Sequence, residues 1–148
     1  MQILVNRVRQ SALLEVPAAK AYGVVADIER YPEFLPGCEK VVVLTADSDR
    51  VTAQVQVSGA GQRVTFVTEN RLEDRRIGVS LREGPFRKLE GLWQFTPIGD
   101  LGCRVEIDVT YELETLLGVV FKPFADVVTA KVVDAFIARV EQAATDGG

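Results

Sequence analysis

The sequence predicts an α+β fold in which a curved antiparallel sheet wraps around a long C-terminal helix. Two observations carry this prediction. In the middle of the chain, apolar and polar residues alternate in short segments separated by turns, which is typical of strands with one buried face. After Thr115 the apolar spacing becomes helical, and no glycine or proline interrupts residues 124–144. At 148 residues, the chain fits one domain over residues 1–148.

The N-terminal part predicts one strand followed by short helices. Residues 2–16 have the pattern of a strand, and Pro17 suits the first position of a helix, where its missing N–H costs nothing. Residues 18–28 place Tyr22, Val25 and Ile28 on one side at three-residue spacing. Two prolines in the segment 31–36 then limit a second helix to about one turn.

The middle of the chain predicts an antiparallel meander. Connections such as 47–49, 59–61 and 99–100 are too short for the crossovers that parallel strands need. We therefore expect six or seven strands with one dry face and one wet face. The alternation covers residues 51–58, 63–70, 76–82, 88–95 and 103–113.

The C-terminal helix is expected to begin at Pro123 and to run to Ala144, with Asp126 in its first turn. One helix is too slim to fill the inner surface of such a sheet, so the arrangement predicts a cavity for an apolar molecule. The alternative is that the large aromatic residues fill that space, and periodicity does not decide between the two. The apolar stripe of the helix is formed by Phe124, Val127, Val128, Val132, Ala135, Phe136 and Val140.

Candidate ligand-binding residues point to the dry face or lie beside the expected mouth of the cavity. Three of them, Thr68, Asn70 and Tyr111, are polar. A ligand carbonyl or hydroxyl would satisfy them; backbone groups or water near the strand ends are the alternative. The complete candidate set is Phe34, Leu35, Phe66, Thr68, Asn70, Trp93, Phe95, Tyr111, Phe124, Val128 and Phe136.

The sequence is more typical of a binding protein than of an enzyme. It contains no histidine, which removes the commonest general base and the commonest metal ligand. Cys38 and Cys103 lie far apart without metal-ligand spacing, and we expect two free thiols. The acidic residues of the last strand, Glu106, Asp108 and Glu112, fall on the wet face. We predict no catalytic residue, cofactor or metal.

Charge and hydropathy bear on partners and location. The formal net charge of −4 argues against DNA binding, which needs concentrated positive charge. No segment is long and apolar enough to span a membrane, and no targeting peptide is recognisable, so we expect a cytoplasmic protein. A local basic cluster would serve a surface contact or form an ordinary solvated strand face; it consists of Arg71, Arg75, Arg76, Arg82, Arg87 and Lys88.

Two segments carry a family resemblance. Residues 27–38 read DIERYPEFLPGC and residues 84–97 read GPFRKLEGLWQFTP. Together they resemble the START-like (SRPBCC) superfamily, in the branch of coenzyme Q-binding proteins, ribosome-association toxins and polyketide cyclases/dehydrases. The resemblance implies a helix-grip (START/Bet v 1-like) fold with a deep pocket between sheet and C-terminal helix, whose mouth lies near residues 31–36. Many relatives carry tryptophan where this chain has Gly37, which implies a wider mouth or a lost family contact.

Three functions are compatible with these observations. The first is non-enzymatic binding or transport of a hydrophobic small molecule, such as a polyprenyl quinone or another lipid. The second, which the resemblance implies, is that of a ribosome-associated toxin that binds the large ribosomal subunit and inhibits subunit joining. The third is that of a polyketide aromatase/cyclase.

Overall fold

The computed structural model describes residues 3–59, 61–114 and 131–144. In chain order its elements are β1 (Ile3–Leu14), α1 (Ala18–Ala26), the 3-10 helix η1 (Ile28–Glu33), β2 (Cys38–Ala46), β3 (Arg50–Gly59), β4 (Gln62–Glu73), β5 (Arg76–Glu83), β6 (Lys88–Ile98) and β7 (Gly102–Glu114). Residues 131–144 form a further helix, here called the C-terminal helix.

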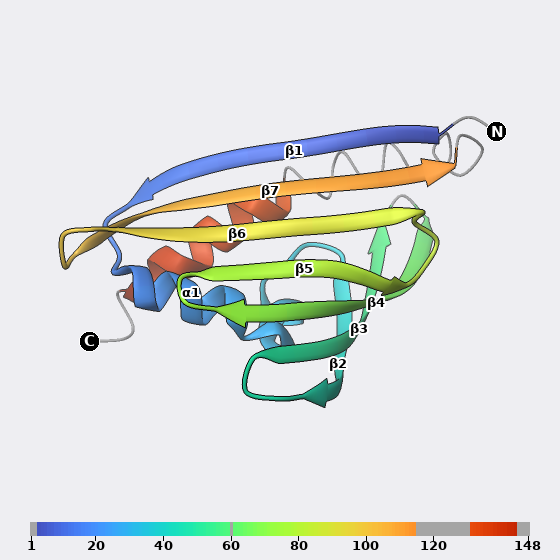
Figure 1. Cartoon of the computed structure of the whole chain (residues 1–148), viewed down its shortest axis with the longest axis horizontal. Helices are drawn as coiled ribbons and strands as arrows, with labels where there is room; N and C mark the ends of the chain where they lie inside the picture. Colours follow the sequence, from blue (N-terminus) through green and yellow to red (C-terminus); the bar gives the residue numbers. More distant parts are fainter. Residues whose placement is uncertain (1–2, 60, 115–130, 145–148) are drawn as a thin grey trace.

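The seven strands form one antiparallel sheet in the order β1-β7-β6-β5-β4-β3-β2 (Figure 1). Each strand from β2 to β7 pairs with its neighbour in the chain, as the predicted meander requires, while β1 pairs with β7. The first and the last strand therefore lie side by side. This pairing leaves β1 and β2 as the two edges of the sheet.

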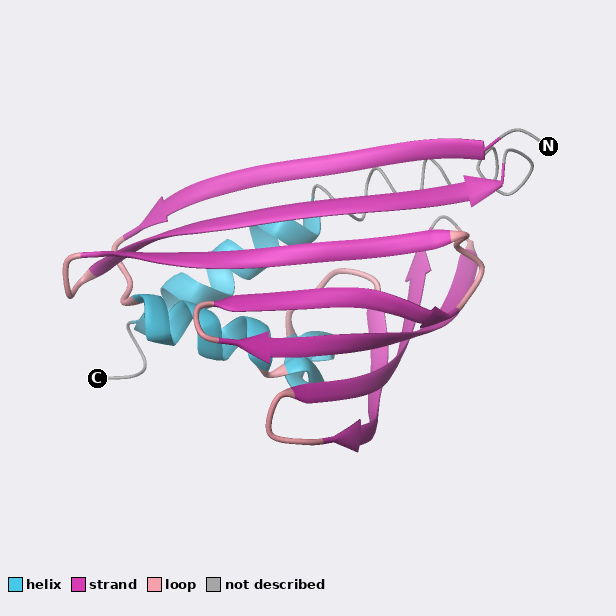
Figure 2. Ribbon diagram, in the orientation of Figure 1, coloured by secondary structure: helices cyan, strands magenta, loops and turns pink. Residues whose placement is uncertain are grey.

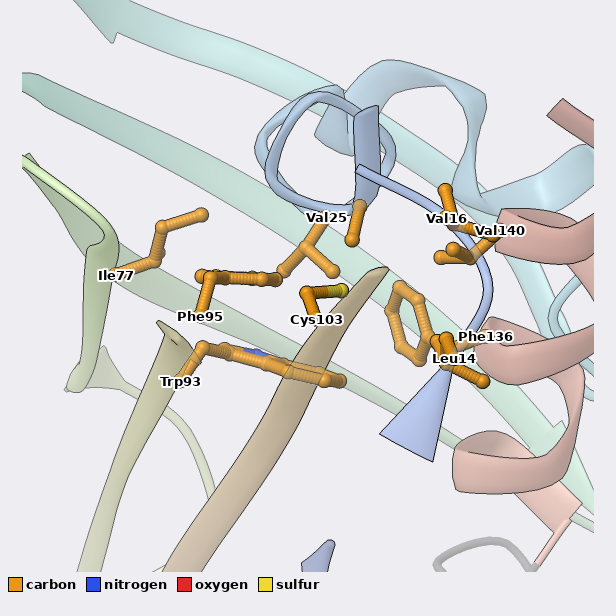
Figure 3. Packing of buried hydrophobic residues seen from close by; sticks show 10 residues of the cluster. Leu14, Val16, Val25, Ile77, Trp93, Phe95, Cys103, Phe136 and Val140 are labelled. Atoms are coloured by element: carbon orange, nitrogen blue, oxygen red, sulfur yellow. The ribbon is translucent and has the colours of Figure 1, made fainter. Parts of the chain in front are cut away.

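The helices pack against one face of the sheet (Figure 2). Val25 of α1 and Phe136 and Val140 of the C-terminal helix belong to the same buried cluster as Trp93 and Phe95 of β6. Figure 3 shows these side chains gathered between the helices and the sheet. The predicted α+β architecture with a helix packed inside an antiparallel sheet is thus confirmed.

The elements differ from the prediction chiefly in the first half of the chain. The first helix ends at Ala26, and a 3-10 helix containing Pro32 follows in place of a single turn. Strand β2 is an additional strand that alternation did not reveal. The C-terminal helix is described from residue 131 onward, so its predicted start at Pro123 lies outside the described residues. No helix in the described ranges is both long and apolar enough to cross a membrane.

Candidate functional site

The inner face of the sheet is apolar except for a few uncharged polar groups. Alternation along the strands places Val55, Val64, Ile77, Trp93 and Phe95 among its buried residues. In the described strands, no Asp, Glu, Lys or Arg occupies the inward register. A molecule held against this face would be bound by burial of apolar surface and by neutral hydrogen bonds.

At the end of the inner face nearest α1, aromatic rings from three parts of the chain pack together. Phe136 lies at the centre, with ring centroids 4.9 Å from Trp93, 5.1 Å from Tyr31 and 5.4 Å from Phe34, all edge-to-face. Phe95 stacks on Trp93 at 6.3 Å. Such geometry adds about 0.5–1.5 kcal/mol per pair beyond burial. We call this the helix-side cluster; it consists of Tyr22, Tyr31, Phe34, Trp93, Phe95 and Phe136.

The helix-side cluster leaves little free space. An apolar cavity between β1, β6, β7 and the C-terminal helix has a volume of about 20 Å³ and is bordered by Trp93, Phe136 and Val140. That volume accommodates about one water molecule. The hydroxyl of Tyr31 donates to the carbonyl oxygen of Val25, and burial is the main cause that raises the pKa of Tyr31. This end of the inner face is a packed core.

A second aromatic group closes the opposite end of the inner face. Phe86 lies edge-to-face between Phe66, at 5.8 Å, and Tyr111, at 6.3 Å. Phe86 is brought there by the turn after β5, in which Gly84 has φ +151°. A Cβ on Gly84 would lie 2.7 Å from Cβ of Phe66, so this close approach requires glycine. We call Phe66, Phe86 and Tyr111 the turn-side cluster.

Between the two clusters the inner face carries small residues and a buried polar pair. Thr68 and Asn70 of β4 are 3% and 5% exposed. Their inward neighbours across β3 are Ala53 and Val51. The Oδ1 atom of Asn70 is buried and has no hydrogen-bond partner among the described residues. Because such an acceptor has lost its water without compensation, it is a candidate point of ligand contact.

The outer face of the same strands carries charge. Arg71, Arg75 and Arg76, here called the hairpin arginines, surround the β4–β5 turn; all three are exposed, and none forms an ion pair with a described residue. The guanidinium of Arg71 lies over Gly78, where an added Cβ would be 3.2 Å from Nη2. Glu73 and Asp74 lie in the same hairpin, which reduces the local surplus of positive charge.

Other outer-face charges are paired. Asp108 of β7 accepts hydrogen bonds from Arg7 at 3.0 and 2.7 Å, and Arg9 lies 3.8 Å away. Accordingly, the guanidinium of Arg7 lowers the pKa of the Asp108 carboxyl. Over β4 to β7 the outer face is hollowed into a groove of about 390 Å³ that includes Arg71, Arg76 and Asp108 in its lining.

The basic cluster predicted from the sequence is divided along strand β5. Arg76 opens this strand, and Arg82 lies near its other end. Lys88 opens β6 and lies 3.8 Å from Glu90. The hairpin arginines and the group around Arg82 therefore lie at opposite ends of the hairpin strands.

The predicted ligand-binding residues are distributed over these regions. Phe34, Trp93, Phe95 and Phe136 belong to the helix-side cluster, against which Leu35 also packs. Phe66 and Tyr111 belong to the turn-side cluster, with Thr68 and Asn70 between the two clusters. Phe124 and Val128 lie outside the described residues. The candidate set does not include Phe86, although this residue lies in the segment 84–97 that carries the family resemblance. Contact of any of these residues with a ligand remains a prediction.

The glycine at position 37, beside the expected mouth of the cavity, is explained by the backbone. Gly37 has φ +79°, and a Cβ there would lie 2.5 Å from the carbonyl oxygen of Ser58. Ser58 N–H in turn donates to the Gly37 carbonyl at 2.7 Å, so the backbone itself requires glycine.

Cys38 and Cys103 are buried free thiols, and burial raises the pKa of Cys38 to about 11. Within the described ranges no group of three potential metal ligands occurs.

Comparison with known proteins identifies the family of this chain. The model of the family described as polyketide cyclase / dehydrase and lipid transport matches residues 14–137. The chain belongs to this family. Two family relatives from Escherichia coli align with 96% of this chain and 91% of their own length: the persistence and stress-resistance toxin PasT of strain CFT073, 38% identical, and the ribosome association toxin RatA of strain K12, 37% identical.

More distant members extend the comparison. A mitochondrial coenzyme Q-binding protein COQ10 homolog B from Xenopus laevis is 27% identical over 73% of this chain and 46% of its own length. The aromatase/cyclase ZhuI from a Streptomyces species superimposes with a TM-score of 0.82 over 95% of this chain and 96% of its own, at 16% identity. A START superfamily protein from Mycobacterium smegmatis superimposes with a TM-score of 0.78 over 92% of this chain and 97% of its own. These solved structures establish the START-like fold.

Proposed function

We propose that this chain associates with the ribosome and acts, as RatA is named to do, as a ribosome association toxin. The observation that carries the proposal is the identity of 37% with RatA over 96% of this chain and 91% of that protein. This similarity extends over nearly the full length of both chains, at an identity well above the 16% of a solved structure that shares the fold alone. The proposed target is the large ribosomal subunit, and the proposed effect is inhibition of subunit joining. We accordingly propose a cytoplasmic location.

The outer face at the β4–β5 hairpin is the proposed contact surface. The hairpin arginines are exposed and have no ion-pair partner in the described part of the chain, so their charge is available to a phosphate. A Cβ on Gly78 would lie 3.2 Å from Nη2 and 3.4 Å from Nε of Arg71, so this guanidinium lies close to the sheet surface. Guanidinium groups bind phosphate with paired hydrogen bonds. RNA contact through a few arginines is compatible with a net charge of −4, because contact depends on the local charge and Asp108 of β7 is already paired with Arg7.

Sedimentation tests this proposal directly. The purified chain is mixed with bacterial 30S, 50S and 70S particles and centrifuged through sucrose. We expect the chain to sediment with 50S particles and to reduce the 70S peak when free subunits are combined. Binding should weaken several-fold when the salt concentration is doubled, since phosphate contacts release counterions. A chain that stays at the top of every gradient at low salt would exclude ribosome association.

Charge reversal identifies the contact surface. Arg75→Glu combined with Arg76→Glu should reduce co-sedimentation at least tenfold. The matched control is Lys40→Glu combined with Lys131→Glu, which changes the net charge equally at exposed positions on β2 and the C-terminal helix. Equal loss in both double variants would show that only net charge matters, and the hairpin would then not be the contact surface.

A second candidate function is the binding of a hydrophobic small molecule, such as a polyprenyl quinone or another lipid, between the sheet and the C-terminal helix. Membership of a family described by lipid transport and the uncharged inner face support it. The observation that favours it specifically is the buried Oδ1 of Asn70, which has no hydrogen-bond partner in the described part of the chain. Native mass spectrometry of the chain purified under gentle conditions tests it, and a chain that never carries or takes up an apolar molecule would contradict it. No observation on the described residues favours the aromatase/cyclase reading, because ZhuI at 16% identity shares the fold alone.

A further inference from the structure

The side-chain amide of Asn70 is in an unusual environment for a polar group. It is 5% exposed, and the residues opposite it on the neighbouring strands are Val51 of β3 and Val79 of β5. Its Oδ1 accepts no hydrogen bond from a described residue. Thr68, the next inward residue on β4, is 3% exposed. Buried polar atoms in folded proteins nearly always have partners, so this acceptor requires an explanation.

The inward row of residues around Asn70 is apolar and includes one glycine. Across β5 and β6, the inward row that begins at Asn70 continues to Val79 and then to Gly91, which has no side chain. A Cβ on Gly91 would be in ordinary contact with Val109 at 3.4 Å and with Val79 at 3.7 Å. Next to Thr68, the inward residue of β3 is Ala53. The row is therefore apolar and lacks a side chain at Gly91, and it lies between the helix-side and turn-side clusters.

We propose that Asn70 is the head-group recognition residue for an uncharged hydroxyl compound, an alcohol or a phenol with an apolar tail. This inference rests on the second candidate function above and names its ligand class. The hydroxyl hydrogen is donated to Oδ1 of Asn70. The hydroxyl oxygen remains free to accept, for instance from the hydroxyl of Thr68. The tail lies on the apolar row.

The chemistry of the inner face selects this head group over others. A quinone carbonyl or an ether offers only acceptors and leaves Oδ1 without a donor. A carboxylate or phosphate would be buried without a cation, because no Lys or Arg occupies the inward register of the described strands. An ammonium would equally lack an acidic partner there. Burial of an unpaired charge is far more costly than burial of a hydroxyl.

A matched pair of ligands tests the proposal on the full chain. 4-Nonylphenol carries the donor, and 4-nonylanisole replaces the hydroxyl hydrogen by a methyl group and keeps the apolar tail. Binding is followed by calorimetry and by the fluorescence of Trp93, the single tryptophan. We expect the wild type to bind the phenol at least tenfold more tightly than the anisole. In Asn70→Leu, both ligands should bind with the affinity that the wild type shows for the anisole.

The control variant is Gln94→Leu, which also replaces an amide by leucine but lies on the outward register of β6, opposite Glu106. It should keep the tenfold preference for the phenol. Equal binding of the two ligands by the wild type overturns the proposal and leaves the interior-binding function standing. A preference that survives in Asn70→Leu also overturns the proposal. Failure of the wild type to bind either ligand overturns both. The wild-type comparison holds even where a variant does not fold.

Discussion

At the scale of single residues, Asn70 combines a cost to folding with a proposed role in binding. A buried acceptor without a donor destabilises the folded chain by about 1–3 kcal/mol, and Oδ1 of Asn70 has no donor among the described residues. A buried unsatisfied group in a folded protein requires an explanation, and a role in binding is one. The unliganded protein should therefore gain stability when the amide is removed.

Asn70→Leu should raise the free energy of unfolding by about 1 kcal/mol, because an apolar side chain of similar size replaces one whose buried Oδ1 has no donor among the described residues. For a chain of this length we expect a rise in Tm of about 2–4 °C. Calorimetric melting without ligand measures the change. Gln94→Leu, on the outer face, should change Tm by no more than about 1 °C. A large loss of stability in Asn70→Leu would show that the amide has a structural partner.

Because of Cys38, the free energy of unfolding should depend on pH in the alkaline range. Burial raises the pKa of its thiol from 9.0 to about 11, so the folded chain holds this proton more tightly than the unfolded chain. The stabilisation is complete below pH 9 and is lost as pH rises towards 11, by at most about 2–3 kcal/mol. Urea unfolding at pH 8, 9, 10 and 11 should show this decline. Cys38→Ala should be less stable at pH 8 but should have a shallower slope between pH 9 and 11.

At the scale of elements, the turn after β5 determines how the sheet is closed at one end. Gly84 adopts φ +151°, and a Cβ added to it would lie 2.7 Å from Cβ of Phe66. This turn places Phe86 between Phe66 and Tyr111. Since the contact involves the first side-chain carbon of Phe66, rotation of that side chain cannot relieve it.

Gly84→Ala should lower the free energy of unfolding by about 2–4 kcal/mol, through backbone strain and separation of the turn-side cluster. Chemical denaturation measures this loss. Gly23→Ala is the opposite control: Gly23 lies within α1 with nothing within 4 Å of an added Cβ, so alanine should stabilise the helix by about 0.5–1 kcal/mol. Similar effects of the two substitutions would contradict the proposed role of the turn.

Most elements could be predicted from the sequence because their pattern is local. Alternation identifies six strands, since each has one wet face and one dry face. Strand β2 escapes it: Val41, Val42, Val43 and Leu44 form a continuous apolar run, and pairing with β3 shifts register between Val43 and Thr45. On this edge strand Val42 and Leu44 are exposed, which a rule that assigns apolar residues to the interior cannot reproduce.

The candidate site could be predicted only in part, for the same reason. The inward direction of Thr68 and Asn70 follows from their distance along β4 from Phe66, and their burial agrees with it. The missing partner of Asn70 depends on residues far away in the chain and leaves no local signal. Phe86 escaped because it lies in a turn, outside any alternating segment. For Gly37, sequence comparison implied a wider mouth, whereas the close approach to Ser58 is visible only in three dimensions.

At the scale of the whole molecule, the sheet separates two chemistries. Its inner face is uncharged in the described strands, and its outer face carries the arginines and carboxylates. Both proposed functions are therefore compatible in one chain, since an apolar molecule inside and a ribosomal subunit outside would not compete for space. Neither proposal depends on the other.

A single backbone nevertheless serves both sides. On β4, Asn70 faces inward and the next residue, Arg71, faces outward. The proposed ligand site and the proposed ribosome contact surface are therefore separated by a single peptide unit. A ligand that rotates the peptide group between Asn70 and Arg71 also shifts the guanidinium of Arg71. We expect 4-nonylphenol to change the affinity for 50S particles, and these particles to change the affinity for the phenol by the same factor. Titrations with each partner in the presence of the other measure the two factors. If both affinities stay constant, the inner and outer faces of β4 are not coupled.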